Sequence, residues 1–429
     1  MNRIEFFPYA KDLLCTKSLS CYLDLLDPEC FSEVKIYSRI QKPITSKIKM
    51  LTLQSLASLQ LVSSICSQKR VLILLRKCPP FVSLSETLRV KQTKQYKRLE
   101  RKVAKVLSNI PLPSLLRKQV MSQLLHASQE VLKWIHCHTD NPTLKIKVPR
   151  HFVWNLNGSI CYKKTAELIV QDESRTIPQR FKMACLYCQE EAIRELWIKM
   201  KSNQQKIFYN PKSPEIIKQN HIISYWSYQI QTAPIRWKSE KMFTLAAFDY
   251  AVSEGHLEAT RFFFELLQGR RRSLLEVYVR KLASKRNYEV YYKFLSTNGV
   301  CNLLFYLHNR MDPVDQEDIR QRYPFAFLMS CLSNYRLRDF LDAVGENKRY
   351  LTYHHFLLLL KIVFSKHVLR FEDNDYWTIF QELFFVSKTV LRTEPDVGGY
   401  TTLALIQQNL YIIQTKKLSL KLIEKIGIY

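Results

Sequence analysis

Glycine is scarce in this chain, with 8 glycines among 429 residues. Loops that bind phosphate through backbone N–H groups depend on glycine, and neither Gly-x-x-x-x-Gly-Lys-(Ser/Thr) nor Gly-x-Gly-x-x-Gly occurs. The His-Glu-x-x-His and Gly-x-Ser-x-Gly patterns of two hydrolase classes are missing too. We therefore expect a protein that is not an enzyme and has no cofactor. The alternative is an enzyme whose catalytic residues are dispersed in the sequence.

Long apolar runs are also missing. No stretch reaches the about 18 apolar residues that a membrane-spanning helix needs. The best candidate, 356–364, is short and contains Lys361, so we expect a buried core helix there. At the N-terminus, Glu5, Pro8 and Lys11 interrupt the apolar run that a secretory signal would need. We expect no transmembrane segment.

Cysteine usage points to an intracellular compartment. The 11 cysteines are odd in number and scattered along the chain, unlike a disulfide framework. Reduced thiols in the cytoplasm or nucleus are the simpler interpretation. Cys185 and Cys188 form a Cys-x-x-Cys pair, but no further ligands follow at the spacing of a zinc site. We expect both on one apolar face of a helix, with no metal bound.

Apolar residues make up 47% of the chain, enough for a real core, and few segments alternate as strands do. Helical spacing recurs instead, for example at Leu56, Leu59 and Val62. We predict an all-α fold. Residues 139–160 are rich in Asn, Pro and Gly, so we divide the chain into a basic helical region, 1–140, and an array of antiparallel helix pairs, 160–429. Residues 202–231 are predicted to form a long irregular excursion.

The clearest local pattern covers residues 243–267. Ala251 lies in a helix with small residues, Gly255-His256-Leu257-Glu258-Ala259 follows, and a bulky apolar helix comes next. This segment resembles the ankyrin family, although the family's Thr-Pro-Leu-His opening is missing. The same order is seen in three other segments, 181–197 (with Ala184), 282–295 and 327–341. The alternative is a generic helical domain in which glycine ends one helix.

The resemblance implies units of two antiparallel helices that stack on their neighbours and offer a surface to a partner. Within the second helix of the clearest unit, the residues predicted to fill the space toward the next pair are Leu257, Phe262, Phe263, Leu266 and Leu267.

Positive charge is concentrated in one region. The net charge is +27, and residues 35–150 alone contain 23 Lys or Arg against 4 Asp or Glu. A basic helix is predicted over 87–107. The candidate binding residues lie in this helix and in a second run: Lys94, Lys97, Arg98, Arg101, Lys102, Arg270, Arg271 and Arg272. The alternatives are a solvated helix face, a nuclear import signal or, for the second run, a helix C-cap with complementary charge.

Taken together, these features predict a non-catalytic, intracellular scaffold for protein–protein interaction that uses a helical-repeat surface. The excess of positive charge favours an acidic partner protein. The alternative function is nucleic-acid binding through 35–150, where Lys and Arg would neutralise phosphates. The sequence leaves the partner's identity and the oligomeric state open.

Overall fold

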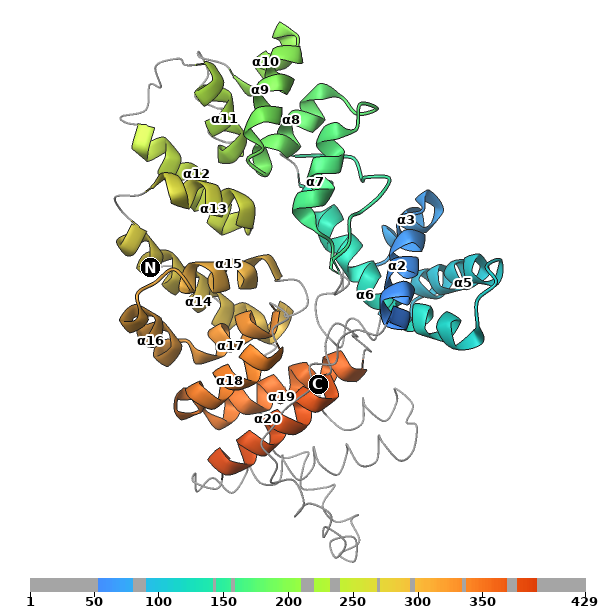
Figure 1. Ribbon diagram of the computed structural model, residues 1–429, viewed down its shortest axis with the longest axis vertical. Helices are drawn as coiled ribbons and strands as arrows, with labels where there is room; N and C mark the ends of the chain where they lie inside the picture. Colours follow the sequence, from blue (N-terminus) through green and yellow to red (C-terminus); the bar gives the residue numbers. More distant parts are fainter. Residues whose placement is uncertain are drawn as a thin grey trace, which may run out of the picture. The chain divides into compact units, whose positions relative to one another are not determined.

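A computed structural model describes ten stretches of the chain: 53–79, 90–141, 144–155, 159–209, 220–231, 240–267, 271–293, 298–333, 337–368 and 376–391. All of them belong to one compact unit, Lys49–Tyr429. Every regular element in these stretches is a helix (Figure 1). A single antiparallel bridge joins Trp154 and Ile160. The predicted all-α fold class is confirmed.

The first group of helices surrounds one long helix. Its members are α2 (Leu53–Cys66), α3 (Lys69–Leu75), α5 (Lys94–Ser108) and α6 (Ser114–His138). Helix α6 begins directly after Pro113, packs against α2 and α5, and α3 packs against α5. Several of its apolar side chains, including Val120, Leu124 and Trp134, are fully buried. Burying each such side chain contributes roughly 1.5–3 kcal/mol, so α6 is the core of this group.

The connection after α6 is packed, although its composition suggested a boundary. The Ile146 N–H donates to the His138 carbonyl at 2.9 Å, and both Ile146 and Phe152 are buried. The buried Glu130 carboxylate of α6 accepts a hydrogen bond from the Ile160 N–H at 3.3 Å. This connection therefore covers part of α6. The proposed division into 1–140 and 160–429 stays a prediction.

The remaining helices are α7 (Tyr162–Gln171), α8 (Ile177–Leu186), α9 (Glu190–Lys199), α10 (Ser202–Phe208), α11 (His221–Gln231), α12 (Glu240–Glu254), α13 (Leu257–Leu266), α14 (Arg271–Lys293), α15 (Asn298–His308), α16 (Pro313–Arg322), α17 (Pro324–Ser333), α18 (Leu337–Asn347), α19 (Tyr353–Val368) and α20 (Tyr376–Leu391), with a 3-10 turn, η6 (Lys348–Tyr350). Each packs mainly against helices near it in sequence.

Aromatic rings fill much of the space between these helices. The rings of Tyr225 in α11 and Phe263 in α13 meet edge to face with centroids 4.8 Å apart. Phe248 in α12 and Tyr278 in α14 meet in the same way at 5.0 Å. Aromatic pairs of this kind bury apolar surface and also favour one relative orientation of the two rings. They therefore help to fix how the two helices pack against each other.

Two of the helix-to-helix turns have the same backbone geometry. Cys188 after α8 and Gly255 after α12 are both left-handed, with φ of 51° and 81°. In each turn the next residue donates back across the helix end: Gln189 N–H to the Ala184 carbonyl at 3.0 Å, and His256 N–H to the Ala251 carbonyl at 2.8 Å. This is the bond pattern of a Schellman cap.

The equivalence extends into the helices that follow. N-cap residues Gln189 (φ −87°, ψ 82°) and His256 (φ −84°, ψ 88°) match closely. At the other end, Met200 N–H and Leu267 N–H each donate to the carbonyls three and four residues earlier. All these pairs are separated by the same 67 positions, for example 189 and 256. The segments 181–197 and 243–267 thus contain equivalent helix pairs, as the sequence predicted.

Two other sequence predictions were wrong. The segment 282–295 was expected to contain a turn between two helices, but α14 runs without interruption through Lys293. Its polar stretch lies within a helix because Ser, Lys, Arg and Asn are tolerated there at small cost. The irregular excursion expected over 202–231 contains α10 and α11. In 327–341, α17 ends at Ser333 and α18 begins at Leu337, and residues 334–336, between these helices, lie outside the described residues.

Helix α13 also differs in detail from the expected packing. Phe263 and Leu267 are buried as predicted, and Leu257 and Phe262 pack against the core. Leu266, however, is 49% exposed, and Phe264 is buried in its stead. At 100° per residue, Phe263, Phe264 and Leu267 share one face and Leu266 points away from it.

The apolar segment 356–364 lies in α19, where Phe356, Leu359 and Val363 are buried, as expected for a core helix. Within the described stretches, no helix combines the length and apolar character needed to cross a bilayer.

Candidate binding surface

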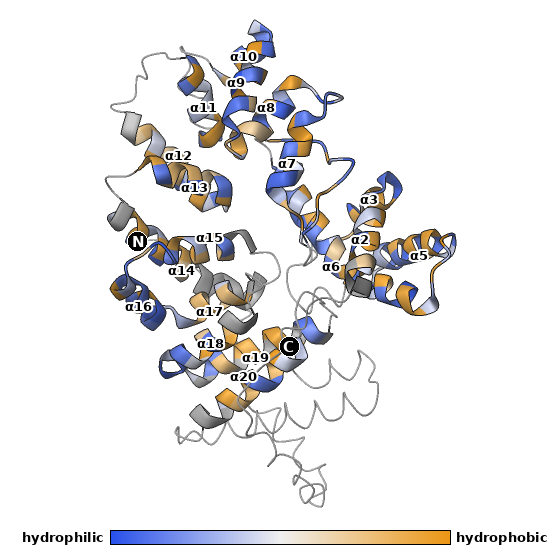
Figure 2. Cartoon of the chain, viewed as in Figure 1, coloured by the Kyte–Doolittle hydropathy of each residue, from blue (hydrophilic) through white to orange (hydrophobic). Residues whose placement is uncertain are grey.

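Helix α5 has one apolar face and one basic face. Thr93 caps its N-terminus: the hydroxyl accepts from the Tyr96 N–H at 3.2 Å and donates to the Val90 carbonyl at 2.7 Å. Tyr96, Leu99, Val103 and Leu107 are buried and recur at three- and four-residue spacing, so they hold one side of α5 against the protein. The colouring of α5 in Figure 2 shows hydrophobic and hydrophilic residues in alternation.

The predicted binding residues of this helix lie on its outer side. Lys94, Lys97, Arg98 and Arg101 are exposed, and Lys102 is half-buried. Lys105 is a further exposed cation of this helix. Lys97, Arg101 and Lys105 follow one another at four-residue steps, so they form a row along the helix. We call the exposed cations Lys94, Lys97, Arg98, Arg101 and Lys105 the basic face of α5.

This face has little negative charge to balance it. Within the described part of the chain, no carboxylate lies within ion-pair distance of its five cations. Glu100 is the one acidic residue of α5. Partial burial raises the pKa of its carboxyl, and the charges of Lys91 and Lys97 oppose this rise. The basic face therefore presents uncompensated positive charge to solvent.

The second predicted run of cations is only partly described. Arg270 lies outside the described residues, and Arg271 and Arg272 begin α14. Helix α13 ends with Leu267 as its C-cap. Arg271 and Arg272 thus stand at a helix N-terminus, where the dipole does not favour cations. The interpretation as a C-cap with complementary charge does not apply to these two residues.

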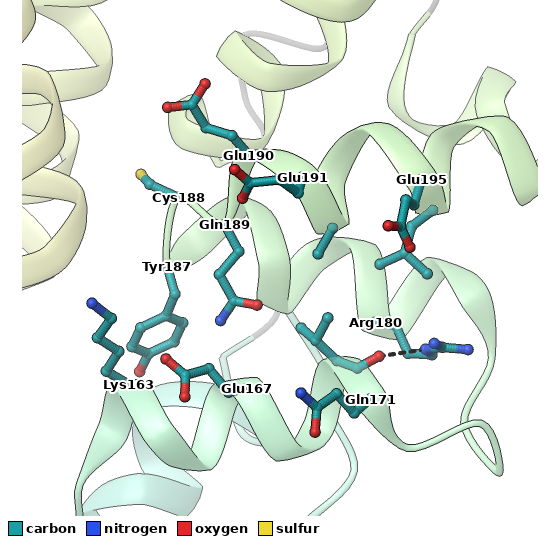
Figure 3. Close-up of a pocket in the computed structure, with 13 residues that line it drawn as sticks. Lys163, Glu167, Gln171, Arg180, Tyr187, Cys188, Gln189, Glu190, Glu191 and Glu195 are labelled. Carbon is teal, nitrogen blue, oxygen red and sulfur yellow. Dashed lines mark hydrogen bonds between the residues drawn. The ribbon is translucent and has the colours of Figure 1, made fainter.

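A groove of opposite sign lies between α7, α8 and α9. It has a volume of about 550 Å³ and is partly open to solvent. Figure 3 shows Lys163, Glu167 and Gln171 on one wall, from α7, and Glu190, Glu191 and Glu195 on the other, from α9. Val170, Ala192 and Leu196 add apolar lining. We call this the acidic groove. Sequence reasoning missed it because its acids come from separate helices.

Only part of the groove's charge is compensated. Glu190 pairs with Arg194 at 3.5 Å and Glu195 with Lys199 at 3.9 Å, both as exposed pairs within α9. Such exposed pairs contribute little to stability, so both carboxylates remain available to another cation. Glu167 and Glu191 have no ion-pair partner among the described residues.

The two cations of the groove are already engaged. The Arg180 guanidinium donates to the Val170 carbonyl at 2.6 Å, and the Lys163 ammonium lies 4.0 Å from the Glu258 carboxylate. At one end stands Tyr187, a buried residue whose hydroxyl lies 2.9 Å from Nε2 of His138. Burial raises the pKa of Tyr187 well above its ordinary value, so the groove gains no negative charge from this phenol.

Cys188, the second residue of the Cys-x-x-Cys pair, lines this groove. Cys185 is buried at the end of α8, whereas Cys188 lies in the following turn, which corrects the prediction that both lie on a helix. Burial raises the pKa of Cys188 to about 12, so its thiol is protonated at neutral pH. No group of three His, Cys, Asp or Glu residues in the described stretches is arranged to hold a metal ion.

Comparisons of the chain with protein families, curated proteins and solved structures found no match.

Proposed function

We propose that this protein is a non-catalytic, intracellular interaction scaffold, which combines helix pairs related to the ankyrin unit with a basic face on α5 that binds an acidic protein partner. The observation that carries the proposal is the basic face of α5, with five exposed cations on a helix whose other side is buried.

The helix pairs support the scaffold part of this proposal. The turns at Cys188 and Gly255 have equivalent backbone geometry, and the residues correspond at a separation of 67 positions. That separation is close to twice the about 33 residues of an ankyrin unit. Repeated pairs of this kind provide extended surfaces that suit protein or peptide partners.

The α5 face supports the choice of an acidic partner. Uncompensated cations in a row attract an oppositely charged surface, and this raises the rate of association and the selectivity for acidic partners. All the cysteines in the described stretches are free, which is in keeping with an intracellular protein.

Nucleic acid is the second candidate, because a row of Lys and Arg would also follow a phosphate backbone. Against it stands Tyr96, the aromatic residue that would stack on a base, which is buried and points away from the basic face. Phosphate contacts would remain, without base stacking by this residue.

A fluorescence anisotropy titration of the full chain tests the proposal. The probes are a labelled poly-glutamate peptide and labelled single- and double-stranded DNA of matched length. We expect the peptide to bind at low salt and to lose at least about tenfold in affinity on the double change Lys97→Glu/Arg101→Glu, since each lost contact with a charged group contributes roughly 1 kcal/mol or more.

The matched control is Lys147→Glu/Lys348→Glu, which changes the net charge equally at two exposed sites away from α5. An equal loss in this control would mean that net charge, and not the basic face, binds the peptide, and the proposal would fail. DNA binding far tighter than peptide binding, abolished by the α5 change, would favour the nucleic-acid function instead.

A further inference from the structure

The basic face of α5 and the acidic groove carry opposite charges with the same spacing. Lys97 and Arg101 lie four residues apart on one helix, and Glu191 and Glu195 lie four residues apart on another. Both pairs therefore repeat at slightly more than one helical turn, or roughly 6 Å along the axis. Residues Glu167 and Gln171 repeat this step on the opposite wall of the groove.

We propose that the acidic groove of one copy of this chain receives the basic face of α5 from a second copy. This inference rests on the proposed function, because it identifies the acidic partner as another molecule of the same protein. The contact joins two different surfaces, so it is heterologous.

Electrostatic attraction favours binding of the α5 cations in the groove. Glu167 and Glu191 have no ion-pair partner in the described stretches, and Glu190 and Glu195 have only exposed ones. The groove's own cations, Lys163 and Arg180, already contact Glu258 and the Val170 carbonyl. The lining contains four carboxylates against these two cations, so incoming ammonium or guanidinium groups meet an excess of carboxylate.

The shape of the groove suits long side chains better than a whole helix. A volume of about 550 Å³ holds a few Lys or Arg side chains, while the helix backbone stays outside. Apolar stems of these side chains can lie against Val170, Ala192 and Leu196, with their charged ends at the carboxylates. Both walls offer acids, so a single row of cations contacts both.

The strength of the contact is limited by the charge of the whole chain. Each copy has a net charge of +27, so two copies repel each other. At physiological salt this repulsion is screened beyond roughly 8 Å, whereas ion pairs between side chains in direct contact are screened less. A small, charged contact of this kind gives weak and reversible association. Since the two surfaces differ, a bound pair leaves one basic face and one acidic groove free, and chains of copies can grow.

Sedimentation velocity of the full chain tests this inference over a range of concentrations in low and high salt. We expect the average sedimentation coefficient to rise with concentration at low salt and to stay at the monomer value at high salt. Two variants reverse one surface each: Lys97→Glu/Arg101→Glu and Glu191→Lys/Glu195→Lys. Each alone is expected to remain monomeric, and an equimolar mixture is expected to associate again.

Recovery in the mixture shows that both variants are folded and that the two surfaces meet. Controls with equal charge change are Lys147→Glu/Lys348→Glu and Glu173→Lys/Glu346→Lys, all at exposed positions, and both should associate like the unmodified chain. A wild-type chain that stays monomeric, or variants with native circular dichroism whose mixture stays monomeric, would overturn the inference. The poly-glutamate titration would then still decide the proposed function independently.

Discussion

Nε2 of His138 lies 2.9 Å from the hydroxyl oxygen of Tyr187, and this contact joins the end of α6 to the turn between α8 and α9. Nδ1 of the same ring lies 2.9 Å from the Trp134 carbonyl, and the ring stacks on the Trp134 indole with centroids 4.4 Å apart. With both nitrogens engaged and the ring buried, His138 is held neutral. Burial lowers its pKa to about 4, although the bond to Trp134 opposes this.

This burial predicts a loss of stability in mild acid. His138, His256 and His308 have pKa values lowered by burial to about 4, 3 and 4. The unfolded chain takes up protons near pH 6.5 and the folded chain does not. Stability is therefore fully present above pH 6.5 and falls as the pH drops toward 4. We expect a lower urea midpoint at pH 5 than at pH 7.

A substitution isolates the contribution of His138. A shift from pKa 6.5 to about 4 corresponds to roughly 3 kcal/mol over the full pH range, at 1.36 kcal/mol per unit. His138→Gln should reduce the loss of stability between pH 7 and pH 5, because glutamine does not take up a proton. The same change should also lower the stability at pH 7. The control is His136→Gln, at an exposed position of the same helix. An unchanged pH dependence in His138→Gln would argue against a neutral, buried His138.

The matched turns predict the effects of two substitutions on stability. Gly255 has φ of 81°, where an added Cβ is strained, so Gly255→Ala should destabilise the protein by about 1 kcal/mol. Cys188 already adopts φ of 51° with a side chain. Cys188→Gly relieves that strain and loses some packing, so its effect should stay within about 1 kcal/mol. Denaturant melts compare the two, and a stabilising Gly255→Ala would contradict the shared geometry.

The packing of α13 predicts a large difference between two neighbouring apolar residues. Phe263 is fully buried and its ring packs against Tyr225, so Phe263→Ala should cost about 3–5 kcal/mol. Leu266 is 49% exposed, and Leu266→Ala should change stability by less than about 0.5 kcal/mol. Equal costs in thermal or denaturant melts would show that the face of α13 has been assigned wrongly.

The contacts of the Glu130 carboxylate are predicted to stabilise the segment that follows α6. It accepts bonds from the Lys133 ammonium at 2.9 Å and the Ile160 N–H at 3.3 Å. Burial acts to raise its pKa, but Lys133, His126 and these bonds prevail and the pKa is lowered. Glu130→Ala leaves buried polar groups unpaired, at a cost of roughly 3–5 kcal/mol. Hydrogen exchange should show lost protection at Ile160. Retained protection there would contradict the contact.

Sequence reasoning found the features that a few local residues determine. The apolar spacing of Leu99, Val103 and Leu107 indicated an amphipathic α5, and Gly255 marked a helix end, because glycine readily adopts positive φ. The sequence indicated a polar turn at 189–191 and placed Cys188 on the preceding helix, whereas the left-handed turn residue is Cys188 itself, and α9 already begins at Glu190. Cysteine rarely takes that conformation.

The features that were predicted wrongly or missed are those that tertiary contacts determine. The polar run around Asn287 looked like a turn, but α14 continues through it. The acidic groove depends on Glu167 and Glu191 meeting across two helices, and no spacing within one segment shows this. The ankyrin relationship and the choice of partner stay predictions.

The preference of the helices from α7 to α20 for neighbours that are close in sequence has a consequence for how the chain acquires its structure. Contacts at short sequence separation require little loop closure, and proteins rich in them fold quickly. A pair such as α12 and α13 can pack as soon as both helices have been synthesised, before the rest of the chain exists. Assembly of the native state can therefore proceed in step with translation, one pair after another.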